Sequence, residues 1–126
     1  MQLGQDAGPL LQVGRLGAET SRFPLEGGGK SVRGFLHVRD ACEAIYAVAT
    51  KGDGDYNIGA LEVFEIRDLV RLICTKMGAK FEEVVEDVPE RPGQDHRYRI
   101  RDRRIREELG WQPKITMDQG LTELLA

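Results

Sequence analysis

Arginine is the residue type with the clearest chemical potential in this chain. Seven of its thirteen arginines lie within residues 90–111, a stretch that opens with an Arg-Pro-Gly turn at residues 91–93. A guanidinium group presents its N–H donors as a planar fork that matches two oxygens of a phosphate. Two or three such groups beside a glycine turn would suit a diphosphate. The stretch therefore indicates a candidate site for a small polyanion.

Two other interpretations of the same stretch stay open. Arg97, Arg99 and Arg101 alternate with Tyr98 and Ile100, the period of a half-buried strand that carries its charges on one side. Such a face could simply be solvated and balanced by the acidic segment before it, which contains Glu82, Glu83, Glu86, Asp87 and Glu90. A nucleic-acid surface would need a wider basic area and more aromatic side chains for stacking. We therefore expect no nucleic-acid partner.

Other motifs that carry chemistry are missing from the sequence. Residues 27–31 read GGGKS, but Pro24 stands where a phosphate-binding P-loop needs a glycine. No G-x-G-x-x-G turn for a dinucleotide occurs, and no tyrosine has a lysine four residues after it. His37 and His96 have no evident serine or cysteine partner for nucleophilic catalysis. We expect a tight turn at the glycines, no catalytic residue and no metal site.

Composition bounds the class of protein. At 126 residues, 40% of them hydrophobic, the chain is long enough for one core, and we expect a single domain. A net charge of −3 gives no general attraction to nucleic acid or to an anionic membrane. No apolar run approaches the ~18 residues of a membrane span, and the N-terminus lacks a signal-peptide pattern. The expected location is the cytoplasm, where Cys42 and Cys74 would be buried or half-buried free thiols.

The hydrophobic pattern predicts a mixed α/β fold, with residues 1–22 as a poorly defined N-terminal segment. Pro9 could open a weak helix that four glycines dilute. From Phe23 on, an apolar segment and the glycine turn lead to a strand over residues 32–38. Asp40 is expected as the N-cap of the next helix, with Glu43 completing a capping box. The face that this helix buries is predicted to hold Ala41, Ala44, Ile45 and Val48.

The rest of the chain alternates between helices and short extended segments. Residues 56–59, YNIG, predict a buried strand, and residues 66–77 predict a helix stopped by Gly78. Strands are expected at 80–88 and 96–101, around a turn at 89–93. Asp102 is placed to cap a short helix ended by Gly110, and Thr116 with Gln119 forms a capping box for the last helix. We find no interior domain boundary within residues 23–126.

Several of these segments, in this order and spacing, resemble the C-terminal, substrate-binding part of extended short-chain dehydrogenase/reductase enzymes that act on nucleotide sugars. VRGFLHVRDACEAI, residues 32–45, resembles the strand-to-helix passage of that family, and YNIG resembles its Tyr-Asn-Ile-Gly strand. ERPGQDHRYRI, residues 90–100, is similar to Asp-Arg-Pro-Gly-His-Asp-x-Arg-Tyr-x-Ile. RIREELGWQPKITMDQGL, residues 104–121, resembles the family's Leu-Gly-Trp-x-Pro ending. Within the family, the likeness is greatest to the dTDP-glucose 4,6-dehydratases.

The resemblance implies roles for particular residues. In this family the arginine of the Val-Arg passage and the Arg-Pro-Gly segment contact the diphosphate of the substrate. Carried over by position, the implied substrate-binding residues are Arg33, Glu90, Arg91, Pro92, Gly93 and Gln94. Arg33 and Arg91 would clamp the diphosphate. The chain departs from the usual residues at Gly34, at Gln94, where the family has histidine, and at Glu26, where it often has tyrosine.

The resemblance also implies what this chain lacks. The complete enzymes bind NAD on an N-terminal Rossmann domain that carries a Tyr-Lys pair, and neither motif occurs here. We therefore interpret residues 23–126 as a small nucleotide-sugar-binding domain without its Rossmann domain, with no cofactor of its own and unable to catalyse alone. The implied partners are a nucleotide sugar such as dTDP-glucose, and a second copy or a separate Rossmann domain. The alternative is a non-catalytic, self-associating interaction module that kept the fold and lost the ligand.

Overall fold

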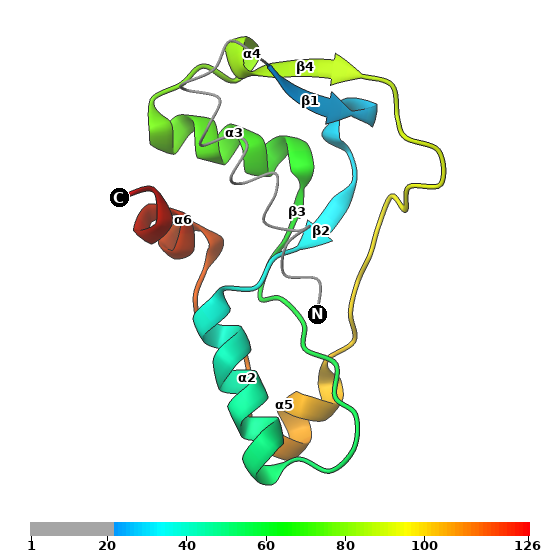
Figure 1. The fold of residues 1–126 in the computed structure, drawn as a ribbon, viewed down its shortest axis with the longest axis vertical. Helices are drawn as coiled ribbons and strands as arrows, with labels where there is room; N and C mark the ends of the chain where they lie inside the picture. Colours follow the sequence, from blue (N-terminus) through cyan, green and yellow to red (C-terminus); the bar gives the residue numbers. More distant parts are fainter. Residues whose placement is uncertain (1–21) are drawn as a thin grey trace. The chain divides into compact units, whose positions relative to one another are not determined.

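A computed structural model describes residues 22–126 (Figure 1), so the weak helix predicted after Pro9 lies outside the described residues. The described chain divides into two compact units. The first unit holds residues 22–31, Glu65–His96 and Leu125–Ala126, and the second holds Val32–Phe64 and Arg97–Leu124. Because the chain passes from one unit to the other several times, no single linker exists for composition to reveal.

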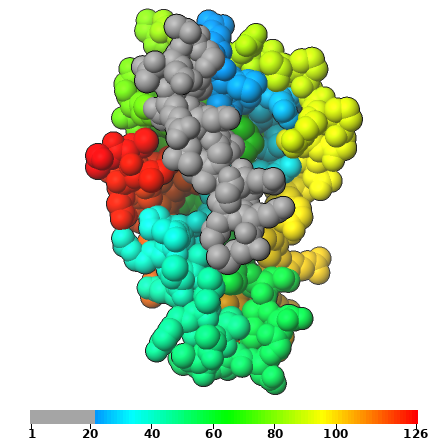
Figure 2. Space-filling model, viewed as in Figure 1, coloured from blue at the N-terminus to red at the C-terminus, as the bar shows by residue number. Residues whose placement is uncertain are grey.

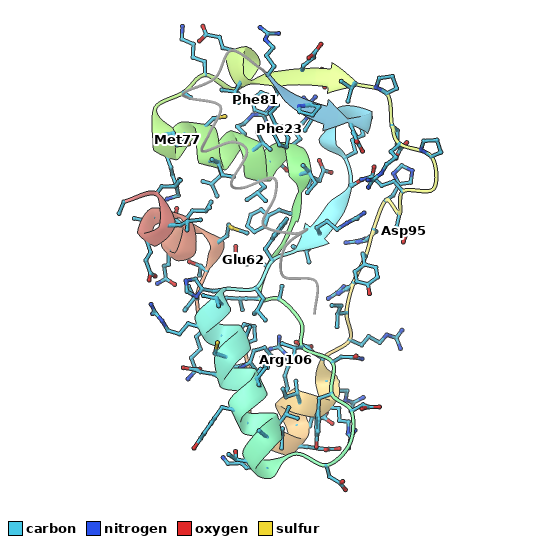
Figure 3. The ribbon with its side chains drawn as sticks, in the orientation of Figure 1. Phe23, Glu62, Met77, Phe81, Asp95 and Arg106 are labelled. Atoms are coloured by element: carbon cyan, nitrogen blue, oxygen red, sulfur yellow. The ribbon has the colours of Figure 1, made fainter. Side chains whose placement is uncertain are left out.

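The first unit packs a helix against a pair of strands. β1 (Phe23–Glu26) and β4 (Val85–Val88) run parallel, with Phe23 opposite Val85. α3 (Ile66–Met77) has the bounds predicted for it and ends at Gly78 in the left-handed conformation, φ 69°. Figure 3 shows Phe23 and Phe81 on the side of the strands that faces α3. The buried apolar side chains of this unit are Phe23, Leu25, Leu69, Val70, Ile73, Cys74 and Val85.

The predicted strand at 80–88 is half right. Its first part is α4 (Phe81–Val84), a single helical turn, and the strand begins only at Val85. Glu82 and Glu83 lie in the first turn of α4, where carboxylates interact favourably with the helix dipole and where a strand would gain little from them. Between β1 and the second unit, the glycines form η1 (Gly27–Gly29), which confirms the predicted tight turn.

The second unit is mainly helical. Its elements are β2 (Val32–Gly34), α2 (Val38–Lys51), β3 (Val63–Glu65, whose last residue belongs to the first unit), α5 (Arg103–Leu109) and α6 (Met117–Leu125). β2 pairs with β3 in a two-stranded sheet. The core cluster consists of Ala44, Ile105 and Trp111, with Leu36, Val48, Tyr56, Ile58 and Leu109 packed against it. Hydrophobic contact between α2, α5 and the segment after α5 therefore holds this unit together.

The start of α2 differs from the prediction. The strand ends at Gly34, and His37 is the N-cap because its Nδ1 accepts a hydrogen bond from the Arg39 amide at 3.0 Å. Val38, predicted to end the strand, is the first helical residue. Asp40, predicted as the N-cap, lies inside the first turn of the helix. The predicted apolar face is also narrower than expected, because Ile45 is 52% exposed.

Asp40 has a different structural role from the one predicted. It is 2% exposed, and its Oδ2 accepts hydrogen bonds from the backbone amides of Lys114 and Ile115, at 3.1 and 2.9 Å. Its main-chain oxygen accepts a bond from Trp111 Nε1 at 3.1 Å. One residue of α2 therefore fixes the segment that follows α5, and Trp111 packs in the core of this unit.

Two predicted strands do not form. Residues 56–59 run as an irregular segment, although Tyr56 and Ile58 pack on the core as expected. In 96–101 the only pairing is an isolated bridge between Arg97 and Val32, and Tyr98 is 59% exposed. The alternating pattern is present, but no neighbouring element covers its apolar side closely enough to make a half-buried strand.

The last two helices differ in how they are capped. Asp102 occupies the N-cap position of α5 as predicted, but its side chain makes no capping hydrogen bond and Oδ2 instead accepts from Arg106 Nε at 2.9 Å, while Gly110 ends the helix at φ 66° as predicted. Thr116 and Gln119 exchange the two hydrogen bonds of a capping box, at 3.0 and 3.2 Å.

The two cysteines differ from one another. Cys74 is buried as expected, and burial raises the pKa of its thiol, whereas Cys42 is exposed, contrary to expectation. Within residues 22–126, none of the helices has the length and hydrophobicity needed to span a bilayer.

Candidate functional site

The Arg-Pro-Gly segment and the glycine turn meet at one edge of the first unit. Because β1 and β4 are parallel, with Glu26 opposite Val88, the chain leaves both strands at the same edge. The glycine turn follows β1, and the loop of residues 89–96 follows β4. Figure 2 shows this loop, in yellow, beside residues of the β1 segment, in blue. In open parallel sheets, ligands bind beyond the carboxyl ends of the strands, and both segments leave the strands at that end.

The glycine turn is held in a conformation that other residues would strain. All three glycines have positive φ, at 57°, 71° and 68°. A Cβ on Gly29 would lie 2.6 Å from Leu25 Cδ1 and 2.9 Å from the Arg67 backbone nitrogen. Arg67 also donates from Nε to the Gly28 oxygen at 2.7 Å. The turn is therefore held in one conformation. Glycine is needed here because the φ angles are positive and because a side chain at residue 29 would clash with Leu25 and Arg67.

The guanidinium group of Arg91 is exposed to solvent beside the glycine turn. Its side chain is 70% exposed, and its Nε lies 3.9 Å from Glu26 Oε2, a loose ion pair. The turn after it is also open: Gly93 has φ 77°, and a Cβ there would meet no atom within 4 Å. Glu90 lies on the inner side of the loop, where a Cβ on Gly27 would come within 3.2 Å of its own Cβ. The loop thus offers a donor fork that an incoming anion can reach.

The side chain of Gln94 is partly buried, unlike that of Arg91. Its Nε2 donates to Ser31 Oγ at 3.3 Å, and its Oε1 is shielded from solvent without a hydrogen-bond partner among the described residues. Ser31 is 6% exposed, and its main-chain oxygen accepts a bond from the Ile66 amide at 3.0 Å. Sequence reasoning missed Ser31, which appeared only as the last residue of a failed P-loop motif. Asp95, on the same loop, is labelled in Figure 3.

Arg33 belongs to the second unit. It lies on β2, is partly buried, and donates from Nη1 to the main-chain oxygen of Val32 at 2.8 Å. The structure therefore places Glu90 beside Gly27, Arg91 beside Glu26 and Gln94 beside Ser31 within one unit. Pro92 and Gly93 lie on the exposed part of the same loop, and Arg33 belongs to the other unit.

The later arginines of the basic stretch mostly pair with acids of the same helix. Arg103 Nε lies 2.7 Å from Glu107, Arg104 Nε lies 3.1 Å from Glu108, and Arg106 Nη2 lies 2.8 Å from Asp102. Hydrogen bonds from Arg104 and then from the Tyr56 hydroxyl, 2.9 Å away, lower the pKa of Glu108. A hollow of ≈ 580 Å³ lies along residues 99–103 of this unit. The ion pairs of Arg103, Arg104 and Arg106 agree with the interpretation of this part of the stretch as a solvated surface.

The N-termini of the longer helices within residues 22–126 are acidic, and these residues contain no cluster of metal-ligating side chains. Each of the three helices with eight or more residues carries an aspartate in its first turn, namely Asp40, Asp68 and Asp118. Negative charge there opposes the binding of a pyrophosphate by the helix N-terminus. Across residues 22–126, no group of three or more His, Cys, Asp or Glu side chains could hold a metal ion.

Comparison with known proteins gives consistent matches. A family model described as GDP-mannose 4,6 dehydratase matches residues 11–124. A dTDP-glucose 4,6-dehydratase from Xanthomonas campestris pv. campestris is 35% identical over 125 residues, which cover 91% of this chain and 35% of that protein. The chain therefore spans about a third of the length of that relative.

Solved structures agree with the sequence matches. A dTDP-glucose 4,6-dehydratase from Streptomyces venezuelae, with NAD and TYD bound, has a TM-score of 0.81 at 31% identity, covering 90% of this chain and 35% of that one. A dTDP-glucose 4,6-dehydratase from Bacillus anthracis, in complex with NAD, has a TM-score of 0.78 at 37% identity, covering 90% of this chain and 36% of that one.

Proposed function

The chain belongs to the GDP-mannose 4,6-dehydratase family, and we propose that it is the nucleotide-sugar-binding portion of a nucleotide-sugar 4,6-dehydratase or epimerase. The observation that carries the proposal is the exposed Arg91 fork beside the glycine turn, at the carboxyl ends of two parallel strands. The ligand group proposed for this place is the diphosphate of the substrate, because a guanidinium fork suits two phosphate oxygens.

The proposed residue roles follow from the geometry of the loop. Arg91 binds the diphosphate, and Pro92 and Gly93 shape the open turn through which it approaches. Glu90 forms part of the inner side of that turn, 3.5 Å from His96 Nδ1. Arg33 is proposed as a second ligand of the diphosphate, to be tested by its own substitution because it belongs to the other unit. The similarity to dTDP-glucose 4,6-dehydratases makes dTDP-glucose the first nucleotide sugar to test.

We propose that this chain alone does not turn over its ligand. A 4,6-dehydratase cycle that passes a hydride out and back needs a nicotinamide held against the sugar. The N-termini of the longer described helices carry aspartates, and the family enzymes whose structures contain NAD are about two and a half times as long as this chain. The cofactor would therefore have to be bound by other residues of such an enzyme. The alternative of an interaction module is not favoured by the similarity to these enzymes.

Calorimetric titration of the purified chain tests the proposal. The ligands are dTDP-glucose, UDP-glucose, GDP-mannose and NAD, each at the same ionic strength because phosphate contacts are sensitive to salt. Saturable binding of one nucleotide sugar, without binding of NAD, is the expected result. If none of the nucleotide sugars binds, the chain has the fold of the family without its ligand site, and the proposal fails.

A further inference from the structure

Gln94 differs from the other loop residues in the direction of its side chain. Arg91 and Gly93 are exposed, whereas Gln94 is partly buried and its Oε1 is shielded from solvent. A shielded oxygen is not in a position to contact a ligand that approaches from solvent. The family resemblance implied a substrate-binding role for Gln94, and its geometry suggests a different one.

The partner of Gln94 is firmly anchored. Ser31 is buried, and its main-chain oxygen accepts the amide of Ile66, the first residue of α3. The bond of 3.3 Å from Gln94 Nε2 to Ser31 Oγ therefore links the middle of the loop to the start of a packed helix. If the amide were turned over, the Ser31 hydroxyl could donate to Oε1 instead, so the same two residues stay paired in either orientation.

Among the described residues, the contacts made by Glu90, Arg91 and Gly93 are weaker than the bond from Gln94 to Ser31. The ion pairs at its ends, Arg91 with Glu26 at 3.9 Å and Glu90 with His96 at 3.5 Å, are long and join partly exposed groups. No atom lies within 4 Å of the Cβ position of Gly93. The Gln94 to Ser31 bond is thus the contact best placed to fix the conformation of Arg91.

We propose that Gln94 is a positioning residue that holds the Arg91 loop through Ser31, and that it does not touch the nucleotide sugar. This inference rests on the proposed function, since it concerns how the proposed diphosphate ligand Arg91 is presented. Ser31 has the same proposed role, because it is the hydrogen-bond partner through which Gln94 holds the loop. A loop held in its binding conformation loses less entropy when the anion binds, so both residues raise affinity without a contact of their own.

Two measurements on the variants Gln94→Ala and Ser31→Ala test the inference. The first is amide hydrogen exchange of residues 90–96 without ligand, which both changes are expected to accelerate to a similar extent. The second is the Kd of dTDP-glucose, which each change is expected to raise about threefold to tenfold, the equivalent of losing one hydrogen bond. The double variant should bind as each single variant does, because both remove the same bond.

The Arg91→Ala background separates positioning from direct contact. If Gln94 acts through Arg91, adding Gln94→Ala to Arg91→Ala changes the Kd by less than about twofold. A full additional loss in that background, with unchanged exchange of the loop amides, would show that Gln94 contacts the ligand and overturn the inference. If the unmodified chain binds no nucleotide sugar, the proposed function fails. The exchange measurement then decides alone, and unchanged exchange in both variants refutes the Gln94 to Ser31 link.

Discussion

At the residue scale, the guanidinium group of Arg91 already has a carboxylate neighbour, Glu26, in addition to the diphosphate that we propose it binds. Glu26 Oε2 is 3.9 Å from Arg91 Nε, and both side chains are partly exposed. A negative charge so close to the guanidinium group weakens its attraction for a diphosphate. The charge of Glu26 is therefore expected to lower the affinity for a diphosphate.

We therefore expect Glu26→Gln to strengthen binding. Removing the charge should lower the Kd of dTDP-glucose by about twofold to fivefold, the size of an exposed ion pair, and the gain should shrink at high salt. Calorimetry at two ionic strengths measures both effects. Glu107→Gln is the matched control, since it neutralises the partner of Arg103 on α5 and should leave the Kd unchanged. Weaker binding by Glu26→Gln would mean that Glu26 contributes to the site.

Glu108 gives a residue-scale prediction that involves no ligand. Its pKa is lowered by hydrogen bonds from Arg104 and from the Tyr56 hydroxyl. A carboxylate whose folded pKa lies below the unfolded value of ~4.3 adds stability above that pH and loses the contribution as the pH falls through the folded pKa. Removing one donor with Tyr56→Phe should therefore raise the pKa of Glu108 toward the unfolded value. NMR titration of the carboxyl carbon measures this, and an unchanged midpoint would contradict the role of the hydroxyl.

At the element scale, local patterns were predicted well and long-range pairing was not. α3 was predicted with its observed bounds because its 12 residues of apolar periodicity and the glycine directly after them are local signals. The pairing of β1 with β4 joins residues about sixty apart, which no local pattern encodes. At α2, His37 and Asp40 are both able to cap a helix, and tertiary contacts decided between them.

Asp40 carries the element-scale prediction. Asp40→Ala removes a buried carboxylate and leaves the partly buried amides of Lys114 and Ile115 without their acceptor, so it should lower the free energy of unfolding by about 2–4 kcal/mol. Urea denaturation followed by the fluorescence of Trp111 measures the change. Glu43→Ala, on an exposed position of the same helix, should change stability by less than about 0.5 kcal/mol. Equal effects of the two changes would show that Asp40 is no anchor.

At the scale of the whole molecule, the family and the mixed α/β fold predicted from the sequence are confirmed by the matches to dTDP-glucose 4,6-dehydratases. The candidate site could be predicted only in part. Residues 90–94 could be proposed from the sequence because a short motif carries them, whereas the contacts of Ser31 and Glu26 with this loop depend on the pairing of β1 with β4. Motif matching also grouped Arg33 with Arg91, although the two belong to different units.

The most direct test of the account is the affinity of Arg91→Ala for dTDP-glucose, measured by calorimetry beside the unmodified chain and Arg103→Ala. Losing a charge-assisted bidentate contact should weaken binding more than tenfold, or about 1.5–3 kcal/mol. Arg103→Ala removes an exposed arginine from the other unit, and this variant should bind like the unmodified chain. Equal affinity of all three proteins would contradict the assignment of the diphosphate to the Arg91 loop.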